Sequence, residues 1–140
     1  MSDRRPVVYL AGPIRQATDP VSWRVSIQQS TTEFAFHNPM DRNVDPRDDP
    51  ADEIVEGDLQ LIDDSDGLLV GYHDEIPSVG TAMEIQYANQ QNIPVVVWKR
   101  DNSDTVISPW LAYHADRICQ QRDAALWQLH GMVSGVSIDA

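Results

Sequence analysis

The stretch Ser78-Val79-Gly80-Thr81-Ala82-Met83-Glu84 decides how this chain is interpreted, because it places a carboxylate about two turns into a helix. The apolar run from Gly67 to Tyr72 precedes it and has the composition of a buried strand. The turn segment 73–77 then leads into a helical pattern from Thr81 to Gln91. In an open α/β sheet, ligands often bind where a strand, a short loop and a helix N-terminus meet. Position alone leaves Glu84 as either a nucleophile or base, or a solvated helix residue.

Outward from this stretch, strand and helix patterns alternate along the chain. Strands are expected at 7–10, 67–72, 93–98 and 116–119, and helices at about 21–35, 51–64, 79–91 and 123–133. A short further helix follows Ser108 as N-cap and Pro109 at its first position. Three prolines indicate a loop over 38–50. The alternation predicts one α/β domain over 1–140, with three layers, a mostly parallel sheet of about five strands, and helices on both faces.

Composition narrows the class of protein. The formal net charge of −12 would repel a phosphate backbone, which argues against nucleic-acid polymers as partners. Lys99 is the only lysine, and this acidic, arginine-based composition is compatible with a salt-loving host. The single cysteine, Cys119, excludes an internal disulfide and fits a buried thiol in a reduced compartment. No signal-peptide core or membrane-length apolar run is evident, so a cytoplasmic location without membrane contact is expected.

The familiar catalytic motifs are absent from the sequence. There is no nucleophile elbow, P-loop lysine motif, paired zinc ligands or dinucleotide glycine fingerprint. The histidines are scattered, and each is expected to be structural or exposed: His37, His73, His114 and His130. An acidic cluster lies in the proline-rich loop and just after it, without ligand spacing, and is interpreted as a solvated face rather than a metal site: Asp41, Asp45, Asp48, Asp49, Asp52 and Glu53. Carboxylate chemistry without metal or cofactor is the remaining catalytic option.

Parallel sheets gather their active groups at the carboxyl ends of the strands. That edge is expected to collect Tyr9, the Gly12-Pro13 turn, the stretch from Ser78 to Glu84, and Ser108. Asp58 lies in the middle of the helix at 51–64. It follows Gly57, which permits close approach of backbone or ligand. Taken alone, Asp58 is interpreted as an ordinary surface acid.

Three groups of residues, taken together, resemble the nucleoside 2-deoxyribosyltransferase family over roughly residues 7 to 119. They are Tyr9-Leu10-Ala11-Gly12-Pro13-Ile14, then Asp58-Leu59 with Ile62 and Ser65-Asp66, then Ser78 to Ile85 with Tyr87-Ala88. The resemblance is consistent with a flavodoxin- or Rossmann-like sheet.

This resemblance implies a role for each of three residues. Glu84 would attack the anomeric carbon of the nucleoside and displace the base, and another base or water would resolve the glycosyl ester. Tyr9 would orient Glu84, and Asp58 would contact the sugar or protonate the leaving base. Such a double displacement retains the anomeric configuration.

The serine positions are similar to those of the Rcl-type nucleoside 5′-monophosphate N-glycosidases. Free-nucleoside transferases commonly have aspartate where this chain has Ser78, and a serine can donate to a phosphate that an aspartate would repel. Ser108 matches a serine that the neighbouring subunit supplies in Rcl-type enzymes, which implies at least a homodimer with a shared active site; alternatively Ser108 only caps its helix. Arg15 could add charge against the phosphate, with Gly12, Ile14 and Gly80 as further substrate-binding positions. Pro13 departs from the Rcl pattern, which has serine there.

The expected function is therefore hydrolysis of (2′-deoxy)nucleoside 5′-monophosphates. Base exchange between deoxynucleosides is the first alternative, and a nucleotide-sensing module without turnover is the second. Three of the four tryptophans, Trp23, Trp98 and Trp110, could stack a base, although core or interface packing is the simpler interpretation of each. No residue indicates which base is preferred, or ribose against deoxyribose.

Overall fold

The computed structural model describes residues 5–14, 17–45, 48–73, 76, 78–101 and 106–134. Its strands are β1 (Val7–Ala11), β2 (Ala35–His37), β3 (Gly67–Tyr72), β4 (Val95–Lys99) and β5 (Arg117–Cys119). Its α-helices are α1 (Ser22–Ser30), α2 (Ala51–Asp63), α3 (Val79–Gln90), α4 (Pro109–His114) and α5 (Arg122–Val133). The predicted alternation of strand and helix is confirmed.

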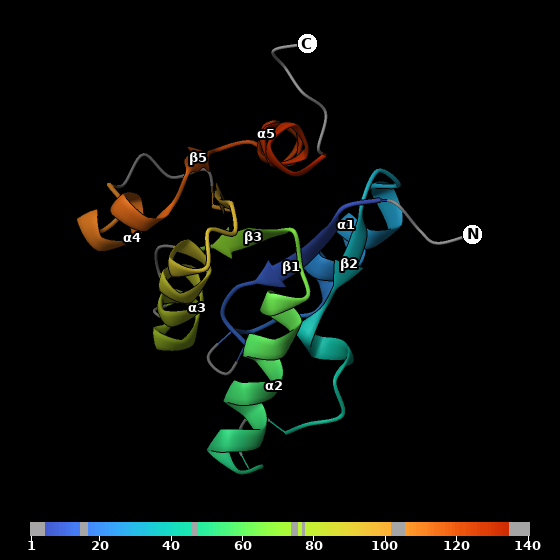
Figure 1. Cartoon of the computed structure of the whole chain (residues 1–140), viewed down its shortest axis with the longest axis vertical. Coiled ribbons are helices and arrows are strands. Elements are labelled where there is room, and N and C mark those ends of the chain that lie inside the picture. Colours follow the sequence, from blue (N-terminus) through green and yellow to red (C-terminus); the bar gives the residue numbers. More distant parts are fainter. Residues whose placement is uncertain are drawn as a thin grey trace.

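All five strands pair in parallel, in the order β2-β1-β3-β4-β5 (Figure 1). The chain leaves β1 toward β2 on one side and returns to β3 on the other, so the strand order reverses between β1 and β3. Tyr9 lies opposite Leu68, and Ala11 lies opposite Val70, at this reversal. The carboxyl ends of two strands at such a switch point form the usual ligand crevice of this architecture.

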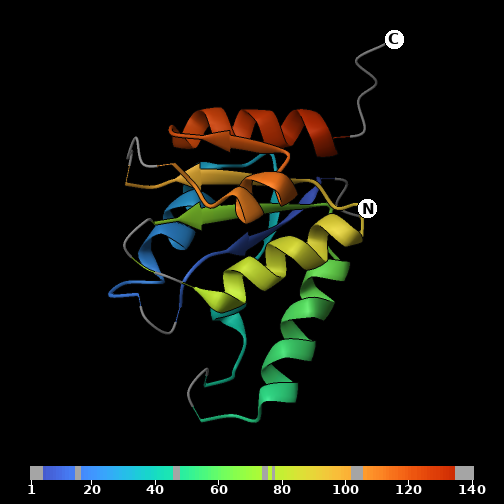
Figure 2. The same cartoon turned by 90° about the vertical axis from the view of Figure 1, so that its left-hand side faces the viewer.

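The sheet lies between two helical layers, as Figure 2 shows with α5 on one side and α2 and α3 on the other. Alternate residues of β1 point to opposite layers, as the pleat requires. Val8 and Leu10 join the core formed with α1 and α5, whereas Tyr9 and Ala11 join the core formed with α2 and α3. The predicted three-layer α/β fold is confirmed, and Tyr9 is directed toward the layer that carries Glu84.

Local signals position the helices on the site side of the sheet. The first turn of α2 carries Asp52 and Glu53, whose charges oppose the positive end of the helix dipole. Ser78 caps α3, and Ser108 caps α4 with Pro109 at its first position. The predicted start of the short helix is therefore confirmed.

One predicted element is wrong. The expected helix over 21–35 ends at Ser30, and Ala35–His37 forms β2 instead. A strand of three residues is too short to show alternation in the sequence, and it is held by pairing with β1, where Val7 lies opposite Ala35. The expected loop over 38–50 also contains a 3₁₀ turn, Pro39–Asp41, which Asn38 caps by accepting from the Met40 N–H.

Two aspartates brace the opposite, amino-terminal edge of the sheet. Asp66 accepts from the Val7 N–H at 2.8 Å and Asp116 accepts from the Val95 N–H at 2.8 Å. Asp66 thus has a structural use within one of the motifs that carry the family resemblance. Within the described residues, no helix is long and apolar enough to cross a bilayer.

Candidate active site

Glu84 and Tyr9 meet in a short hydrogen bond between α3 and β1. The Tyr9 hydroxyl donates to Glu84 Oε2 at 2.5 Å. Tyr9 has no exposed surface, and Glu84 is only partly exposed. On α3, Thr81, Ile85 and Ala88 form the buried face against the sheet. Glu84 precedes Ile85 on this side of the helix and therefore reaches β1 rather than solvent.

Burial sets the charge properties of this pair. It raises the pKa of Glu84 to about 7, with a smaller upward contribution from Asp58; the Tyr9 hydrogen bond and the positive charge of Arg24 act in the opposite direction. Burial, followed by the negative charge of Glu84, raises the pKa of Tyr9 far above its usual value. Tyr9 therefore remains a neutral donor, while Glu84 titrates close to neutral pH.

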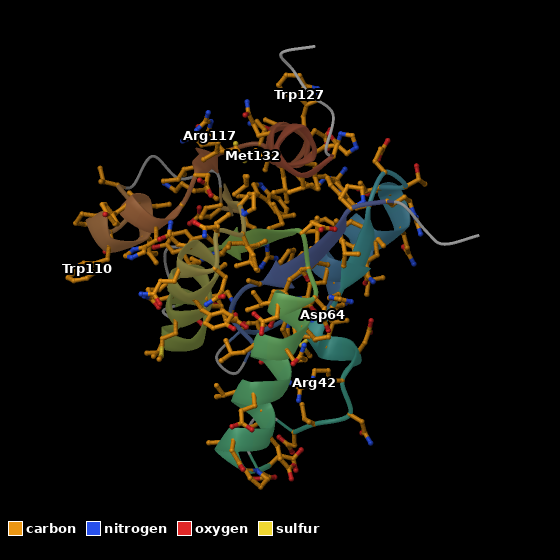
Figure 3. All side chains as sticks on the ribbon, viewed as in Figure 1. Arg42, Asp64, Trp110, Arg117, Trp127 and Met132 are labelled. Carbon is orange, nitrogen blue, oxygen red and sulfur yellow. The ribbon has the colours of Figure 1, made fainter. Side chains whose placement is uncertain are left out.

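Asp58 reaches the same region from α2 and forms an ion pair with Arg42. Arg42 Nη1 lies 2.5 Å from Asp58 Oδ1, and the guanidinium also donates to the carbonyls of Glu53 at 2.8 Å and Ile54 at 3.0 Å. Figure 3 shows Arg42 beside α2. Burial raises the pKa of Asp58, and the hydrogen bond and charge of Arg42 oppose that rise. Asp58 in turn acts electrostatically on both Tyr9 and Glu84.

Gly57 makes room for this ion pair. A Cβ at position 57 would overlap the guanidinium of Arg42. The close approach expected at this glycine is therefore made by a side chain of the protein itself. Asp58, interpreted from position alone as a surface acid, is instead half-buried and paired.

The end of β1 is closely packed around Gly12. A Cβ there would lie 2.9 Å from both the Gly71 carbonyl oxygen and the Trp23 ring, so only glycine fits between β1, β3 and this indole. Pro13 is buried beside it, and the Ile14 carbonyl accepts from the Ala17 N–H at 3.3 Å. Arg15 lies outside the described residues.

The serines of the expected phosphate site both act as helix caps. Ser78 Oγ accepts from the Thr81 N–H at 3.1 Å and donates to Thr81 Oγ1 at 2.7 Å. Ser108 Oγ accepts from the Trp110 N–H at 3.3 Å. Among the described residues, Ser108 makes no hydrogen bond with Tyr9, Asp58 or Glu84. The first turn of α3 is open at Gly80, where a Cβ would meet nothing within 4 Å.

The remaining candidates have structural partners. Three histidines contact backbone carbonyls or another ring. His37 lies 3.1 Å from the Leu61 carbonyl, and His114 lies 2.6 Å from the Trp110 carbonyl. His130 packs edge-on against Phe34. His73 lies 3.9 Å from an Asp101 carboxylate oxygen. Tyr87 ties α3 to α2 by donating to Asp63 at 2.6 Å. Across the described ranges, no three potential metal ligands cluster.

The tryptophans differ in their surroundings. Trp23 is buried and packs edge-on against Trp98, with ring centroids 6.2 Å apart, so both belong to the layer opposite Glu84. Trp110 is 77% exposed on the outer side of α4 (Figure 3). A shallow hollow of about 310 Å³ is lined by Pro109, Trp110, Tyr113 and His114. It includes none of the three candidate catalytic residues.

Sequence reasoning missed two arginines that act on the candidate residues, Arg42 and Arg24. Arg42 follows a turn in an acidic loop, and Arg24 lies on the buried face of α1. Neither has a spacing that links it to Asp58 or Glu84, so only the folded chain reveals them. The one local signal was the glycine before Asp58, which indicated a close approach without naming the partner.

Comparisons with known proteins identify the family. The family model described as nucleoside 2-deoxyribosyltransferase matches residues 8–136. No curated protein matches the chain by sequence.

Three solved structures share the fold. A conserved protein from Enterococcus faecalis V583 aligns with a TM-score of 0.69 and 17% identity, over 91% of this chain and 98% of its own. A 2-deoxyribosyltransferase from Bacillus psychrosaccharolyticus aligns with a TM-score of 0.67 and 14% identity, over 94% of this chain and 93% of its own. One from Leishmania mexicana aligns with a TM-score of 0.59 and 16% identity, over 88% and 95%. At these identities the structures support the fold alone.

The family model covers nearly the whole described chain, and its match includes Tyr9, Asp58 and Glu84. The chain therefore belongs to the nucleoside 2-deoxyribosyltransferase family and is an enzyme that acts on the N-glycosidic bonds of nucleosides.

Proposed function

We propose that the protein hydrolyses (2′-deoxy)nucleoside 5′-monophosphates through a covalent glycosyl ester on Glu84, releasing the free base and (deoxy)ribose 5-phosphate. The observation that carries this proposal is the 2.5 Å hydrogen bond from Tyr9 to Glu84 Oε2. It fixes one carboxylate oxygen and leaves the other available for attack. A partly exposed carboxyl group with a pKa of about 7 is ionised often enough to act as a nucleophile at neutral pH.

The first step breaks the C1′–N bond and forms the ester. A Glu84 oxygen attacks C1′, and the electron pair of the broken bond leaves with the base, which takes a proton from Asp58. Burial raises the pKa of Asp58 and so favours the protonated form that this step needs, while Arg42 holds the carboxyl group in place. Water then gives its proton to Asp58 and attacks C1′, and the bonding pair returns to Glu84.

The phosphate is proposed to bind at the first turn of α3 and the end of β1. Ser78 donates its proton to Thr81 Oγ1 and would rotate to donate to a phosphate oxygen instead. The open surface at Gly80 leaves space for that group near the positive end of the helix dipole. Arg15, Gly12 and Ile14 are the proposed contacts from the chain after β1.

A second copy of this chain is proposed to complete the site with its Ser108, in a homodimer or higher homo-oligomer. The support is an unusual lack of charge over α3 and α4. Glu84 is the only acidic or basic residue of α3, and it faces β1, while α4 has none apart from His114. Because the chain carries a net charge of −12, the repulsion between two copies is smallest when they meet across such a neutral face. The face also exposes large apolar side chains: Val79, Met83, Trp110 and Tyr113.

The test is incubation with a panel of nucleosides and their 5′-monophosphates, with and without a free acceptor base, followed by chromatography of the released base. Monophosphate cleavage that needs no acceptor is expected, together with loss of at least about a thousandfold in Glu84→Gln, since the nucleophile is removed. Base exchange between deoxynucleosides would instead establish the transferase activity for which this family is named.

Three further outcomes decide against parts of the proposal. Equal turnover of nucleosides and monophosphates would remove Ser78 as a phosphate contact. Tight nucleotide binding without base release over hours would favour a sensing module. Undiminished turnover in Glu84→Gln would remove the covalent mechanism.

A reduced, cytoplasmic compartment is also proposed for the enzyme. It is consistent with the one thiol of the chain, Cys119, whose pKa is raised by burial.

A further inference from the structure

A guanidinium is the largest side chain that is fully buried in the described part of the chain. Arg24, on α1, has no exposed surface. It donates from Nε to the Leu10 carbonyl at 3.1 Å, from Nη2 to the Gly12 carbonyl at 3.0 Å and from Nη1 to the Pro20 carbonyl at 2.5 Å. Three of its donors are therefore committed to backbone oxygens at the end of β1 and the start of α1.

The two β1 carbonyls explain what Arg24 does for the strand. Leu10 and Gly12 are two residues apart, so their carbonyls point to the same edge of β1. β2 pairs with β1 only as far as Tyr9, opposite His37, whereas β3 continues along Ala11. Beyond Tyr9, β1 therefore lacks a neighbour on one side. The fork of Arg24 takes the place of that missing strand and holds the end of β1 next to Tyr9.

The charge of Arg24 is not matched by a direct ion pair. Among the described residues, no carboxylate forms a salt bridge with it, and its polar contacts are carbonyl oxygens together with the Trp23 ring, whose centroid lies 4.6 Å from the guanidinium carbon. Burial lowers the pKa of Arg24 to about 10, so the group is still charged at neutral pH. A buried cation is costly unless negative charge balances it.

The negative charge that Arg24 acts on lies across β1. Glu84 accepts a hydrogen bond from Tyr9 of β1. Two charges from other elements act on it, Asp58 from α2, which is itself paired with Arg42, and Arg24 from α1. Tyr9 is neutral, and Asp58, whenever it is ionised, disfavours a second negative charge nearby. The charge of Arg24 acts in the opposite direction and favours the ionised carboxylate, as the smallest of these contributions.

We propose that Arg24 is a positioning residue for the glycosyl-transfer step: it braces the end of β1 that presents Tyr9 to Glu84, and its charge favours the ionised, attacking form of Glu84. The inference rests on the proposed role of Glu84 as nucleophile. It assigns to a residue outside the substrate crevice a share in setting the pH range of the enzyme.

The test compares Arg24→Gln, which removes the charge, with Arg24→Lys, which keeps it. The readout is kcat/KM against pH from about 5 to 9, with thermal unfolding to verify that each variant is folded. In Arg24→Gln, the acidic limb is expected to move upward by about 0.5 to 1 pH unit, since a nearby cation no longer favours the carboxylate. The loss of kcat/KM relative to the parent enzyme is therefore large near pH 6 and small above pH 8. In Arg24→Lys, the limb stays in place while kcat falls at every pH, because a lysine cannot hold both carbonyls.

Arg100→Gln is the matched control. Its guanidinium carbon also lies close to the Trp23 ring, 5.0 Å from the centroid. Arg100 is, however, not among the groups that shift the pKa of Glu84. This variant should leave the acidic limb unmoved. If kcat/KM of Arg24→Gln is lowered equally at all pH values and its acidic limb does not move, the electrostatic role is overturned and only a structural one is left.

A second measurement separates this inference from the proposed reaction. Carboxyl-labelled glutamate allows Glu84 to be titrated by ¹³C NMR without substrate, its signal being assigned by its absence in Glu84→Gln. A higher midpoint in Arg24→Gln but not in Arg24→Lys supports the inference even if no substrate is cleaved, in which case only the proposed function fails. Active enzyme with an unchanged Glu84 midpoint in both variants contradicts the inference alone.

Discussion

At the scale of single residues, the site is organised by one carboxyl group in a protein environment that resists its charge. Glu84 has a pKa near 7 because burial outweighs the Tyr9 hydrogen bond and the charge of Arg24. The proposed nucleophile would owe its reactivity to the same burial that makes its charge unfavourable for stability. The protein stabilises the ionised form of Glu84 less than water would.

This conflict predicts a pH-dependent stability effect of Glu84→Gln. The folded-state pKa of Glu84, about 7, lies above its ordinary value of 4.5. The stability that Glu84 contributes is therefore fully present below about pH 4.5 and is lost as the pH rises through 7. Glutamine carries no charge at any pH. Relative to the parent protein, Glu84→Gln should gain stability between pH 5 and pH 8, by on the order of 2 kcal/mol.

Urea unfolding at a series of pH values measures this difference directly. The comparison is internal, because the same two proteins are measured at each pH. A stability difference that stays constant from pH 5 to pH 8 would mean that Glu84 has an ordinary pKa. In that case its proposed activation by burial is wrong.

At the scale of elements, α2 contributes to the site through a glycine that would weaken an ordinary helix. Glycine in a helix interior costs up to about 1 kcal/mol relative to alanine. Gly57 lies in the middle of α2, and its missing side chain lets Arg42 lie across the helix and reach Asp58. The position therefore exchanges helix propensity for a fixed acid.

Gly57→Ala is expected to destabilise the protein, although alanine is the better helix former. The new Cβ would displace the Arg42 guanidinium and break its bonds to Asp58, Glu53 and Ile54. Each lost hydrogen bond is worth about 1 kcal/mol, which together outweigh the gain in propensity. Thermal unfolding measures the net change.

Gly131→Ala is the matched control for this substitution. Gly131 also lies in a helix, α5, but a Cβ there meets nothing within 4 Å. It should stabilise the protein by up to about 1 kcal/mol. In an Arg42→Ala background, Gly57→Ala should also become stabilising, because the displaced partner is already absent. Destabilisation that persists in this background would assign the cost to another contact of Gly57.

At the scale of the whole molecule, charge is distributed unevenly. The chain is strongly acidic, and α2 carries several carboxylates, whereas the outer surface of α3 and α4 is almost free of charge. This neutral face also carries Ser108 at the cap of α4. Self-association across it should strengthen as added salt screens the net charge of the two copies.

A mixing experiment tests the shared site. Glu84→Gln and Ser108→Ala are each expected to have low activity on monophosphates. If each site combines Glu84 of one copy with Ser108 of the other, a mixed dimer contains one intact site and one doubly substituted site. Random exchange in an equal mixture should then restore about a quarter of the parental activity, since half of all dimers are mixed.

The control is each variant re-equilibrated alone, which should gain nothing. If the mixture recovers no activity although light scattering shows an exchanging dimer, Ser108 only caps its own helix. A monomer at all protein and salt concentrations would exclude the shared site altogether.

The sequence by itself determined most of the elements and indicated the three residues on which the proposed chemistry depends. Apolar spacing identified β1 and β3, and the serine and proline before α4 identified its start, because these signals involve neighbouring residues. The motifs around Tyr9, Asp58 and Glu84 indicated the family for the same reason.

Only the tertiary structure decided what surrounds those residues. β2 has three residues and is stabilised by its pairing with β1, so its sequence shows no period. Arg42 lies 16 positions from Asp58, and Arg24 lies 14 positions from Leu10, without any local pattern. Periodicity records which face of an element is apolar. Which cation meets which carboxylate or carbonyl depends on how the elements pack, and that packing places Glu84 with Tyr9 at the β1 edge.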